Sequence, residues 1–268
     1  MISSNDILEN IDYYIKFIIS MYEKDYEIPV ELKYNIQIVD SIEDSVKDFM
    51  NRTNREYETD EIDYNGTTCV PNTIDEITEI FISKDLIIDC NKNIYQFICT
   101  IIHELTHAID FYNFARKYFD GNYNNMIFNS DPYGFKMWTE FNAKRKSYLM
   151  YSRFLISCFK DNNIPYNKPI DYELGFQNDI ITKSITSNSH NIAVYDIMQY
   201  LGRYSCWELD YYEDFSNGKL FPKIFKEKLE PIISDLYTKL KQNNDSMEYY
   251  NELARLVRLL IGKIALIE

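Results

Sequence analysis

The sequence has little glycine or proline, and it is short of positive charge. Seven glycines and seven prolines among 268 residues, together with 26% charged residues, argue against a disordered or low-complexity chain. The 28 lysines and arginines stand against 42 aspartates and glutamates, and the net charge of −14 repels phosphate backbones and anionic lipid. We therefore expect neither nucleic acid nor a membrane as a partner.

Cysteine is also sparse, and no long hydrophobic run opens the chain. The five cysteines are scattered, odd in number and without a C-x-x-C pair, which predicts free thiols in a reducing compartment. Asp6, Glu9, Asp12 and Lys16 interrupt the apolar residues near the start. We therefore expect no signal peptide, no transmembrane segment and a cytoplasmic location.

Only three histidines are present, and two of them lie in His103-Glu104-Leu105-Thr106-His107, an H-E-x-x-H motif. In a helix, residues four apart lie one turn from each other, so both imidazoles point the same way and can bind one metal ion. Glu104 lies at the edge of that face, close enough to hold a water on the metal without being a ligand. The alternative is a buried amphipathic helix in which the histidines only satisfy hydrogen bonds.

Apolar residues around the motif recur at intervals of three and four, which predicts a helix. Asn93 with Gln96 three residues later fits an N-cap, and Gly121 fits a stop beyond the far end. The apolar positions are Ile98, Ile101, Ile102, Leu105, Ala108, Ile109 and Tyr112.

Before this helix the pattern predicts a helix over residues 7–22, a strand over Tyr34–Val39, a helix within 40–63 and strands within 74–88, the clearest at Glu79–Ser83. Asn65-Gly66 is a turn signal. This order indicates a small mixed sheet backed by helices. A strand just before a metal-site helix could pair with an extended peptide through an exposed edge, or it could be an ordinary core strand.

The remainder of the chain is mostly helical, with helix signals over 137–159, 192–204, 220–240 and 245–266. We therefore predict an α+β fold. An N-terminal lobe, residues 1–121, would hold the H-E-x-x-H helix, and a helical C-terminal lobe, residues 122–268, would complete one compact catalytic domain.

Two histidine nitrogens leave a catalytic zinc site incomplete, since such a site usually has three protein ligands and an open position. Only His190 remains among the histidines, so the third ligand is sought among the acids. Glu140 fits, because Asp131 as N-cap and Pro132 at the first helical position predict a return helix that carries it.

These motifs resemble a known group of enzymes. The run His103 to Asp110, followed by Glu140-Phe141-Asn142-Ala143, resembles the H-E-x-x-H-x-x-D and E-[FY]-x-A motifs of zincin metallopeptidases with a glutamate third ligand, the gluzincins. The pattern is similar to that of the lethal-factor-like and Pro-Pro endopeptidases, and phage-type repressor-cleaving metallopeptidases have a similar E-x-x-A. The resemblance implies a zincin-like fold, a Zn²⁺ cofactor and a protein or peptide substrate.

In the lethal-factor-like group a tyrosine seven residues before the ligand glutamate stabilises the transition state, and the matching residue is Tyr133. If Tyr133 does not serve, His190 or Tyr148 is the alternative donor to the oxyanion. A metzincin is a weaker match, because Asp110 and Asn113 occupy its glycine and third-ligand positions.

Two further residues have two interpretations each. Asp110 lies one turn beyond His107 and could accept the outer N–H of a ligand imidazole, fixing its tautomer; otherwise it is a solvated helix charge. His190 lies in the polar run Ser187–Asn191, which predicts a loop that ends near the cleft or is simply exposed.

The functional prediction is a zinc metalloendopeptidase. Zn²⁺ on His103, His107 and Glu140 would lower the pKa of its water towards ~7, and Glu104 would act as general base. The alternative from another class is a metal-binding structural or regulatory protein without proteolytic activity, for instance part of a phage or mobile element. A third possibility is a metal-free, purely structural histidine pair.

Overall fold

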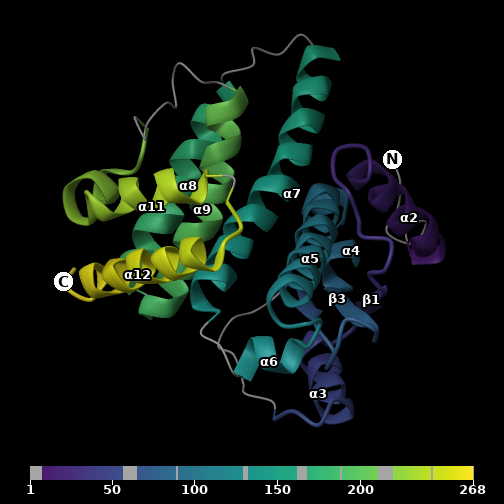
Figure 1. Ribbon diagram of the computed structural model, residues 1–268. Coiled ribbons are helices and arrows are strands. Elements are labelled where there is room, and N and C mark those ends of the chain that lie inside the picture. Colours follow the sequence, from purple (N-terminus) through teal and green to yellow (C-terminus); the bar gives the residue numbers. More distant parts are fainter. Residues whose placement is uncertain are drawn as a thin grey trace. The chain divides into compact units, whose positions relative to one another are not determined.

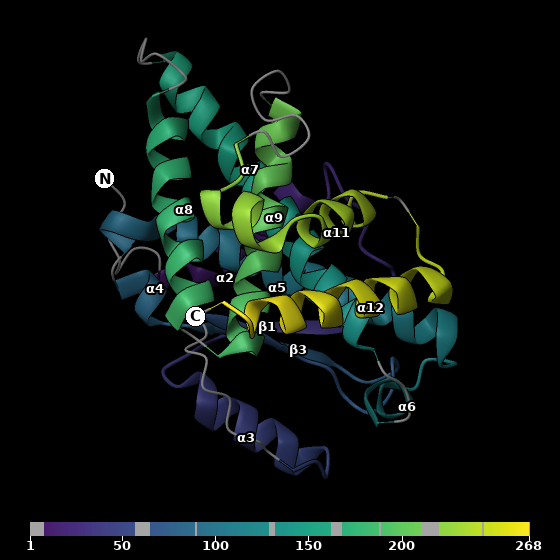
Figure 2. The same ribbon diagram turned by 90° about the vertical axis from the view of Figure 1, so that its left-hand side faces the viewer.

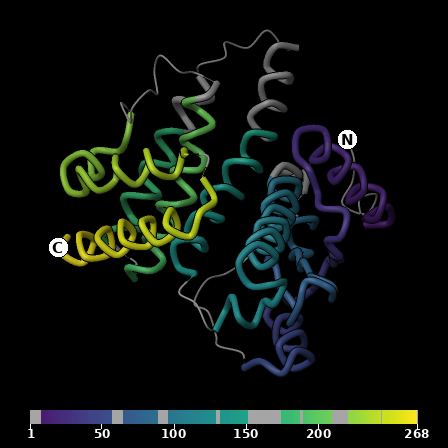
Figure 3. Tube along the Cα trace, in the orientation of Figure 1, coloured from purple at the N-terminus to yellow at the C-terminus, as the bar shows by residue number. Residues whose placement is uncertain are grey.

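The computed structural model describes residues 8–56, 65–88, 90–128, 132–161, 168–187, 189–210, 220–242 and 244–267. Figure 3 traces the chain in colours that follow the sequence. Contacts within the chain divide it into two compact units, Met1–Asp131 and Pro132–Glu268. Figure 1 labels most of the helices and strands.

The first unit combines helices with a small sheet. Its elements, in chain order, are α2 (Ile11–Tyr22), β1 (Tyr34–Val39), α3 (Ile42–Arg52), β2 (Gly66–Cys69), β3 (Thr78–Ser83), α4 (Asp85–Ile88), α5 (Cys90–Tyr118) and α6 (Tyr123–Phe128). The predicted order of helix, strand, helix, strands and histidine helix is confirmed in outline, but the predicted strand region 74–88 contains only β3, because Asp85–Ile88 is the short helix α4 and β2 lies before the region.

The sheet has three strands in the order β1-β3-β2. β1 pairs with β3 in parallel, with Tyr34 opposite Thr78, and β2 pairs with β3 in antiparallel, with Gly66 opposite Ile82. The predicted small mixed sheet is therefore confirmed. The turn predicted at Asn65-Gly66 does not include Gly66, which is the first residue of β2.

Alternate side chains of the strands cover the two faces of the sheet. Ile80 and Ile82 of β3 are fully buried on the face that α5 covers, and Thr68 of β2 lies on that face as well. The opposite face packs on α3, and Figure 2 shows α3 and α5 on opposite sides of β1 and β3. The core on the α3 side consists of Phe49, Cys69 and Phe81, with Val39, Val46 and Met50 around them.

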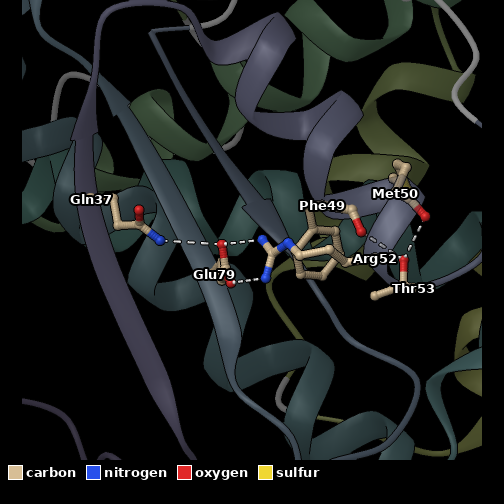
Figure 4. A network of polar contacts seen from close by, with 6 residues as sticks. All are labelled: Gln37, Phe49, Met50, Arg52, Thr53 and Glu79. Atoms are coloured by element: carbon tan, nitrogen blue, oxygen red, sulfur yellow. Dashed lines mark hydrogen bonds and ion pairs between the residues drawn. The ribbon is translucent and has the colours of Figure 1, made fainter.

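A polar network connects α3 to the sheet (Figure 4). The guanidinium of Arg52 donates to both carboxylate oxygens of Glu79 at 2.9 and 3.0 Å, and the amide of Gln37 donates to the same carboxylate at 3.2 Å. Bidentate pairing of this kind fixes orientation as well as charge. It ties the end of α3 to β3 and β1.

Helix α5 is longer than its apolar pattern indicates. It begins at Cys90, so Asn93 lies inside it and the predicted N-cap is wrong; α4 ends only two residues earlier and packs on α5. The predicted stop is confirmed, because Gly121 adopts φ +75° and its N–H donates to the carbonyl of Ala115 at 3.0 Å. Left-handed backbone of this kind suits glycine after a helix.

The described elements of the second unit are all helices. Its elements are α7 (Tyr133–Asp161), α8 (Lys168–Ser187), α9 (His190–Asp210), the π-helical turn η2 (Phe225–Leu229), α11 (Ile232–Leu240) and α12 (Met247–Ile264). Pro132, predicted as the first residue of this helix, lies immediately before α7, and the predicted N-cap Asp131 lies outside the described residues.

Helices α7 and α9 run side by side in the same direction (Figures 1 and 2). A Cβ on Gly202 of α9 would lie 2.5 Å from the carbonyl oxygen of Phe141 on α7, so glycine is needed at this crossing. Further along, the Cys206 thiol lies 3.1 Å from the carbonyl oxygen of Arg145 and the Trp207 indole donates to the Tyr148 hydroxyl. The two backbones therefore touch beside Glu140.

Taken together, the described residues form a helix-rich α+β structure with one three-stranded sheet, as predicted. None of their helices combines the length and the apolar character that a bilayer span requires. Among the described residues, Cys69, Cys99 and Cys206 are not in disulfides, in keeping with the expectation from their spacing.

The glycine at the α7–α9 crossing gives a first prediction. Gly202→Ala should lower the free energy of unfolding by about 1–3 kcal/mol, because the added methyl overpacks a backbone contact. The matched control is Gly175→Ala on α8, where an added Cβ meets nothing within 4 Å. That change should leave stability equal or raise it by up to ~1 kcal/mol. Urea unfolding measures both, and equal effects of the two substitutions would contradict the assigned contact.

Candidate metal centre

Helix α5 presents His103 and His107 one turn apart, both buried. Their Nε2 atoms lie 3.0 Å apart, and the ring planes meet at 86° with centroids separated by 4.6 Å. With zinc–nitrogen bonds of about 2.0–2.1 Å, two nitrogens of a tetrahedral site lie roughly 3.3 Å apart. The two nitrogens therefore converge nearly as one ion requires, and they are also within range of a direct hydrogen bond.

His107 and Thr106 each have a packing or hydrogen-bond partner around the motif. His107 stacks on Phe111 one turn further along, with ring centroids 5.8 Å apart. The hydroxyl of Thr106 donates to the carbonyl of Ile102 at 2.8 Å and lies 3.4 Å from the hydroxyl of Tyr22 on α2. Thr106, the remaining polar residue of the motif, thus has hydrogen-bond partners on α5 and α2.

Asp110 is buried on α5, so the alternative of a solvated helix charge is wrong. Burial raises the pKa of the Tyr22 hydroxyl, and the negative charge of Asp110 raises it further, which places this carboxylate near the α2–α5 contact. The hydrogen bond from a ligand imidazole to Asp110 stays a prediction.

Glu104 is buried next to the histidines, and a strand residue holds its carboxylate. The hydroxyl of Thr68 on β2 lies 2.9 Å from Oε2 of Glu104 and 2.8 Å from the main-chain oxygen of the same residue. A hydroxyl that donates to an ionised oxygen offsets part of the cost of burying it. The candidate general base is therefore oriented by the sheet.

Gly66 permits this close approach of β2 to α5. A Cβ at position 66 would lie 2.7 Å from Cγ2 of Thr100 and 3.0 Å from Cγ of Glu104. Both contacts are tighter than ordinary side-chain packing, so the strand could not lie this near the helix with a larger residue there. Gly66 thus brings Thr68, two residues along the same face, within reach of Glu104.

Cys69 ends β2 on the other face of the sheet. Burial, aided by the charge of Glu104, raises the pKa of its thiol to about 12. The thiol therefore stays protonated at neutral pH, which disfavours a nucleophilic role.

In the second unit, α7 carries both Glu140 and Tyr133. The helix begins at Tyr133, so the two residues lie seven positions apart, nearly two turns, on the same side of one helix. Both are half-buried. Burial raises the pKa of the Tyr133 phenol, which therefore remains a hydrogen-bond donor at neutral and mildly alkaline pH. Oε2 of Glu140 accepts a hydrogen bond of 2.9 Å from the amide of Gln199 on α9.

The two alternative oxyanion donors have other surroundings. Tyr148 is buried between α7 and α9, where its hydroxyl accepts from Nε1 of Trp207 at 3.2 Å and the guanidinium of Arg203 lies 5.2 Å from its ring centre. His190 is exposed and is the first residue of α9, so its predicted loop position is wrong. Ser189 lies at the start of this helix, and its hydroxyl accepts from the N–H of Ile192.

Two polar residues at these carboxylates were missed from the sequence. Thr68 follows a turn signal and belongs to a strand too short to show alternation, and Gln199 lies in an ordinary amphipathic helix. Each meets its partner across a long separation in the chain, 36 and 59 residues respectively. No local sequence pattern therefore marks Thr68 as a partner of an acid.

Comparison of the chain with protein-family models, with curated proteins and with solved structures gave no match.

Proposed function

We propose that the chain is a zinc-dependent metallopeptidase with a zincin-like fold, in which His103, His107 and Glu140 hold the metal and Glu104 is the general base. The observation that carries the proposal is the convergence of two buried imidazole nitrogens, 3.0 Å apart, beside a buried glutamate whose carboxylate Thr68 orients. The resemblance of both motifs to gluzincins supports the same assignment.

The donor set suits zinc. The proposed ligands are His103, His107 and Glu140. Two neutral imidazoles and one carboxylate are the ligands of known catalytic zinc sites, whereas calcium and magnesium prefer oxygen alone. The buried acids Glu104 and Asp110 on the same helix add negative charge that a divalent cation would offset.

A zinc ion bound there would act as a Lewis acid that polarises the scissile carbonyl and makes a water acidic enough to react near neutral pH. Glu104 would take the proton of the attacking water and deliver it to the leaving nitrogen. Thr68 holds one carboxylate oxygen of Glu104, which leaves the other to meet the water. The phenol of Tyr133 would donate to the oxyanion of the tetrahedral intermediate.

The sheet offers a place for an extended substrate. β2 is a terminal strand of the described sheet, hydrogen-bonded to β3 alone, and it is the strand that contacts Glu104. A peptide that adds to the outer edge of β2 would lie in line with this residue. Main-chain hydrogen bonds would give affinity, and alternate side chains would give specificity.

A second candidate is a metal-binding protein without proteolytic activity, and a third is a metal-free pair. The spacing of 3.0 Å also fits the third, because a direct Nε2–H to Nε2 hydrogen bond has this length. Metal content separates the third candidate from the first two, and cleavage of a peptide library separates the first from the second.

Metal binding is tested by substitution of each ligand. The purified protein should hold one equivalent of zinc by elemental analysis, and His103→Ala or His107→Ala should lose most of it because a site without one imidazole binds weakly. Glu140→Ala should weaken binding at least tenfold. His190→Ala is the matched histidine control and should keep the full equivalent. Full zinc retention in Glu140→Ala would remove Glu140 from the ligand set, and a zinc-free native protein would favour the hydrogen-bonded pair.

The role of Glu104 is tested by Glu104→Gln, which keeps the shape and the acceptor for Thr68 but cannot take a proton. Zinc content should be unchanged, and cleavage of a peptide-library substrate should fall by about 10²–10⁴-fold. Glu248→Gln, in the first turn of α12, is the control and should cleave at the native rate. Undiminished cleavage by the Glu104 variant would show that another group is the base.

The oxyanion donor is tested by a pair of tyrosine substitutions. Tyr133→Phe should lower kcat by about 10²–10³-fold with zinc content and stability unchanged. Because burial raises the pKa of Tyr133, the phenol should stay protonated, and kcat should not fall through its ionisation until above pH ~10. Tyr148→Phe loses the bond from Trp207 and should instead reduce stability by about 1 kcal/mol. The reverse pattern would assign the donor role to Tyr148.

A further inference from the structure

Glu140 shares a polar contact with two residues of α9 that the reaction scheme does not use. The side-chain amide nitrogen of Gln199 donates to Oε2 of Glu140 at 2.9 Å, and it lies 3.1 Å from the hydroxyl of Tyr195, one turn earlier on the same helix. All three side chains are half-buried. The three polar groups thus form a short chain from α9 to the carboxylate.

Chemistry fixes the direction of this chain. An ionised carboxylate only accepts hydrogen bonds, so the amide of Gln199 must turn its nitrogen, not its oxygen, towards Glu140. The amide has two N–H protons, one for Glu140 and one for the hydroxyl oxygen of Tyr195. With both protons used, the amide plane is held, and it holds the carboxylate plane in turn.

The backbone beneath these side chains is also fixed. Gly202 lies three residues after Gln199, and an added Cβ there would lie 2.5 Å from the carbonyl oxygen of Phe141, the residue after Glu140. The two helices therefore touch within one turn of the hydrogen bond. Gln199 meets Glu140 because α9 crosses α7 at this point, and not through a mobile side chain on a distant loop.

We propose that Gln199 is a positioning residue of the metal centre, which binds Oε2 of Glu140 and thereby presents Oε1 to the metal ion. This inference rests on the proposed function, in which Glu140 is the third ligand. Partners that orient a metal ligand typically contribute 10–100-fold to metal affinity. Gln199 would therefore act on affinity through Glu140 and not by contact with the ion.

The alternative is an ordinary hydrogen bond between two helices, and the chain contains a matched example. Gln37 donates its amide to the carboxylate of Glu79 at 3.2 Å within the sheet, with Arg52 as the second partner of that carboxylate (Figure 4). A glutamine–glutamate hydrogen bond thus also occurs in a network that contains no histidine. Gln37→Met controls for the loss of a glutamine–glutamate hydrogen bond as such.

The test measures the affinity of the full chain for Zn²⁺ by competition with a chromophoric chelator. Gln199→Met keeps the length of the side chain and removes both donors, so the dissociation constant should rise by about 10–100-fold. Tyr195→Phe removes only the outer acceptor and should raise it by a smaller factor. Gln37→Met should leave it unchanged. In the Glu140→Ala background, Gln199→Met should have no additional effect, because its action passes through that carboxylate.

The outcomes separate this inference from the function on which it rests. Suppose that the native chain binds zinc and that Glu140→Ala lowers the affinity but Gln199→Met does not. The positioning role of Gln199 is then refuted, while the metal site remains supported. If Gln199→Met weakens binding as much in the Glu140→Ala background as alone, the role through Glu140 is likewise refuted. A native chain that binds no zinc refutes both. Should Gln199→Met fail to fold, Tyr195→Phe decides, since native affinity in that variant contradicts the chain of contacts.

Discussion

The burial of ionisable side chains on one face of α5 is the constraint on which the rest of the first unit depends. His103, Glu104, His107 and Asp110 are all buried on a helix whose other residues include fully buried aliphatic side chains. Removing a carboxylate from water costs several kcal/mol unless it is paired or hydrogen-bonded. The surrounding elements must therefore supply partners, and a cation between the imidazoles would offset more of this cost than any single neutral donor.

At each of the two carboxylates of the proposed site, a glycine allows a neutral hydrogen-bond donor to come within reach. Gly66 lets β2 approach α5 until Thr68 reaches Glu104, and Gly202 lets α9 approach α7 where Gln199 meets Glu140. In each case a side chain at the glycine would collide with the element that carries the acid. A chain with only seven glycines thus uses two of them for backbone contacts beside candidate functional groups.

Local patterns predicted the elements that carry the motifs, because helices and strands leave a periodic signature within a few residues. The bounds of β1 were predicted without error, as was the stop of α5 at Gly121. The start of α5 was misplaced because tertiary packing with α4 extends the helix beyond its amphipathic part. His190 was misplaced because a run of small polar residues indicates a helix start as well as a loop.

The partners of the carboxylates lay beyond any local pattern. Thr68 and Gln199 contribute through contacts between segments far apart in the chain, which depend on how closely two backbones approach and not on the residues next to them. Motif spacing can identify a candidate acid from the residues near it in the sequence. The hydrogen-bond donor that orients this acid can be identified only when the packing of strands and helices is known.

The tautomers of the two histidines follow from how the pair is used. In a direct hydrogen bond, one Nε2 carries a proton and the other accepts it, so the two rings must be different tautomers. With a metal ion, both Nε2 atoms must have free lone pairs, and both rings then carry their proton on Nδ1. Each Nδ1–H needs an acceptor in a buried setting, and metal-binding imidazoles commonly donate it to a carboxylate. A direct histidine pair has one such Nδ1–H, on the accepting ring, whereas a metal site has two, and a buried acid one turn after the second histidine, where Asp110 lies, could accept one of them in either case.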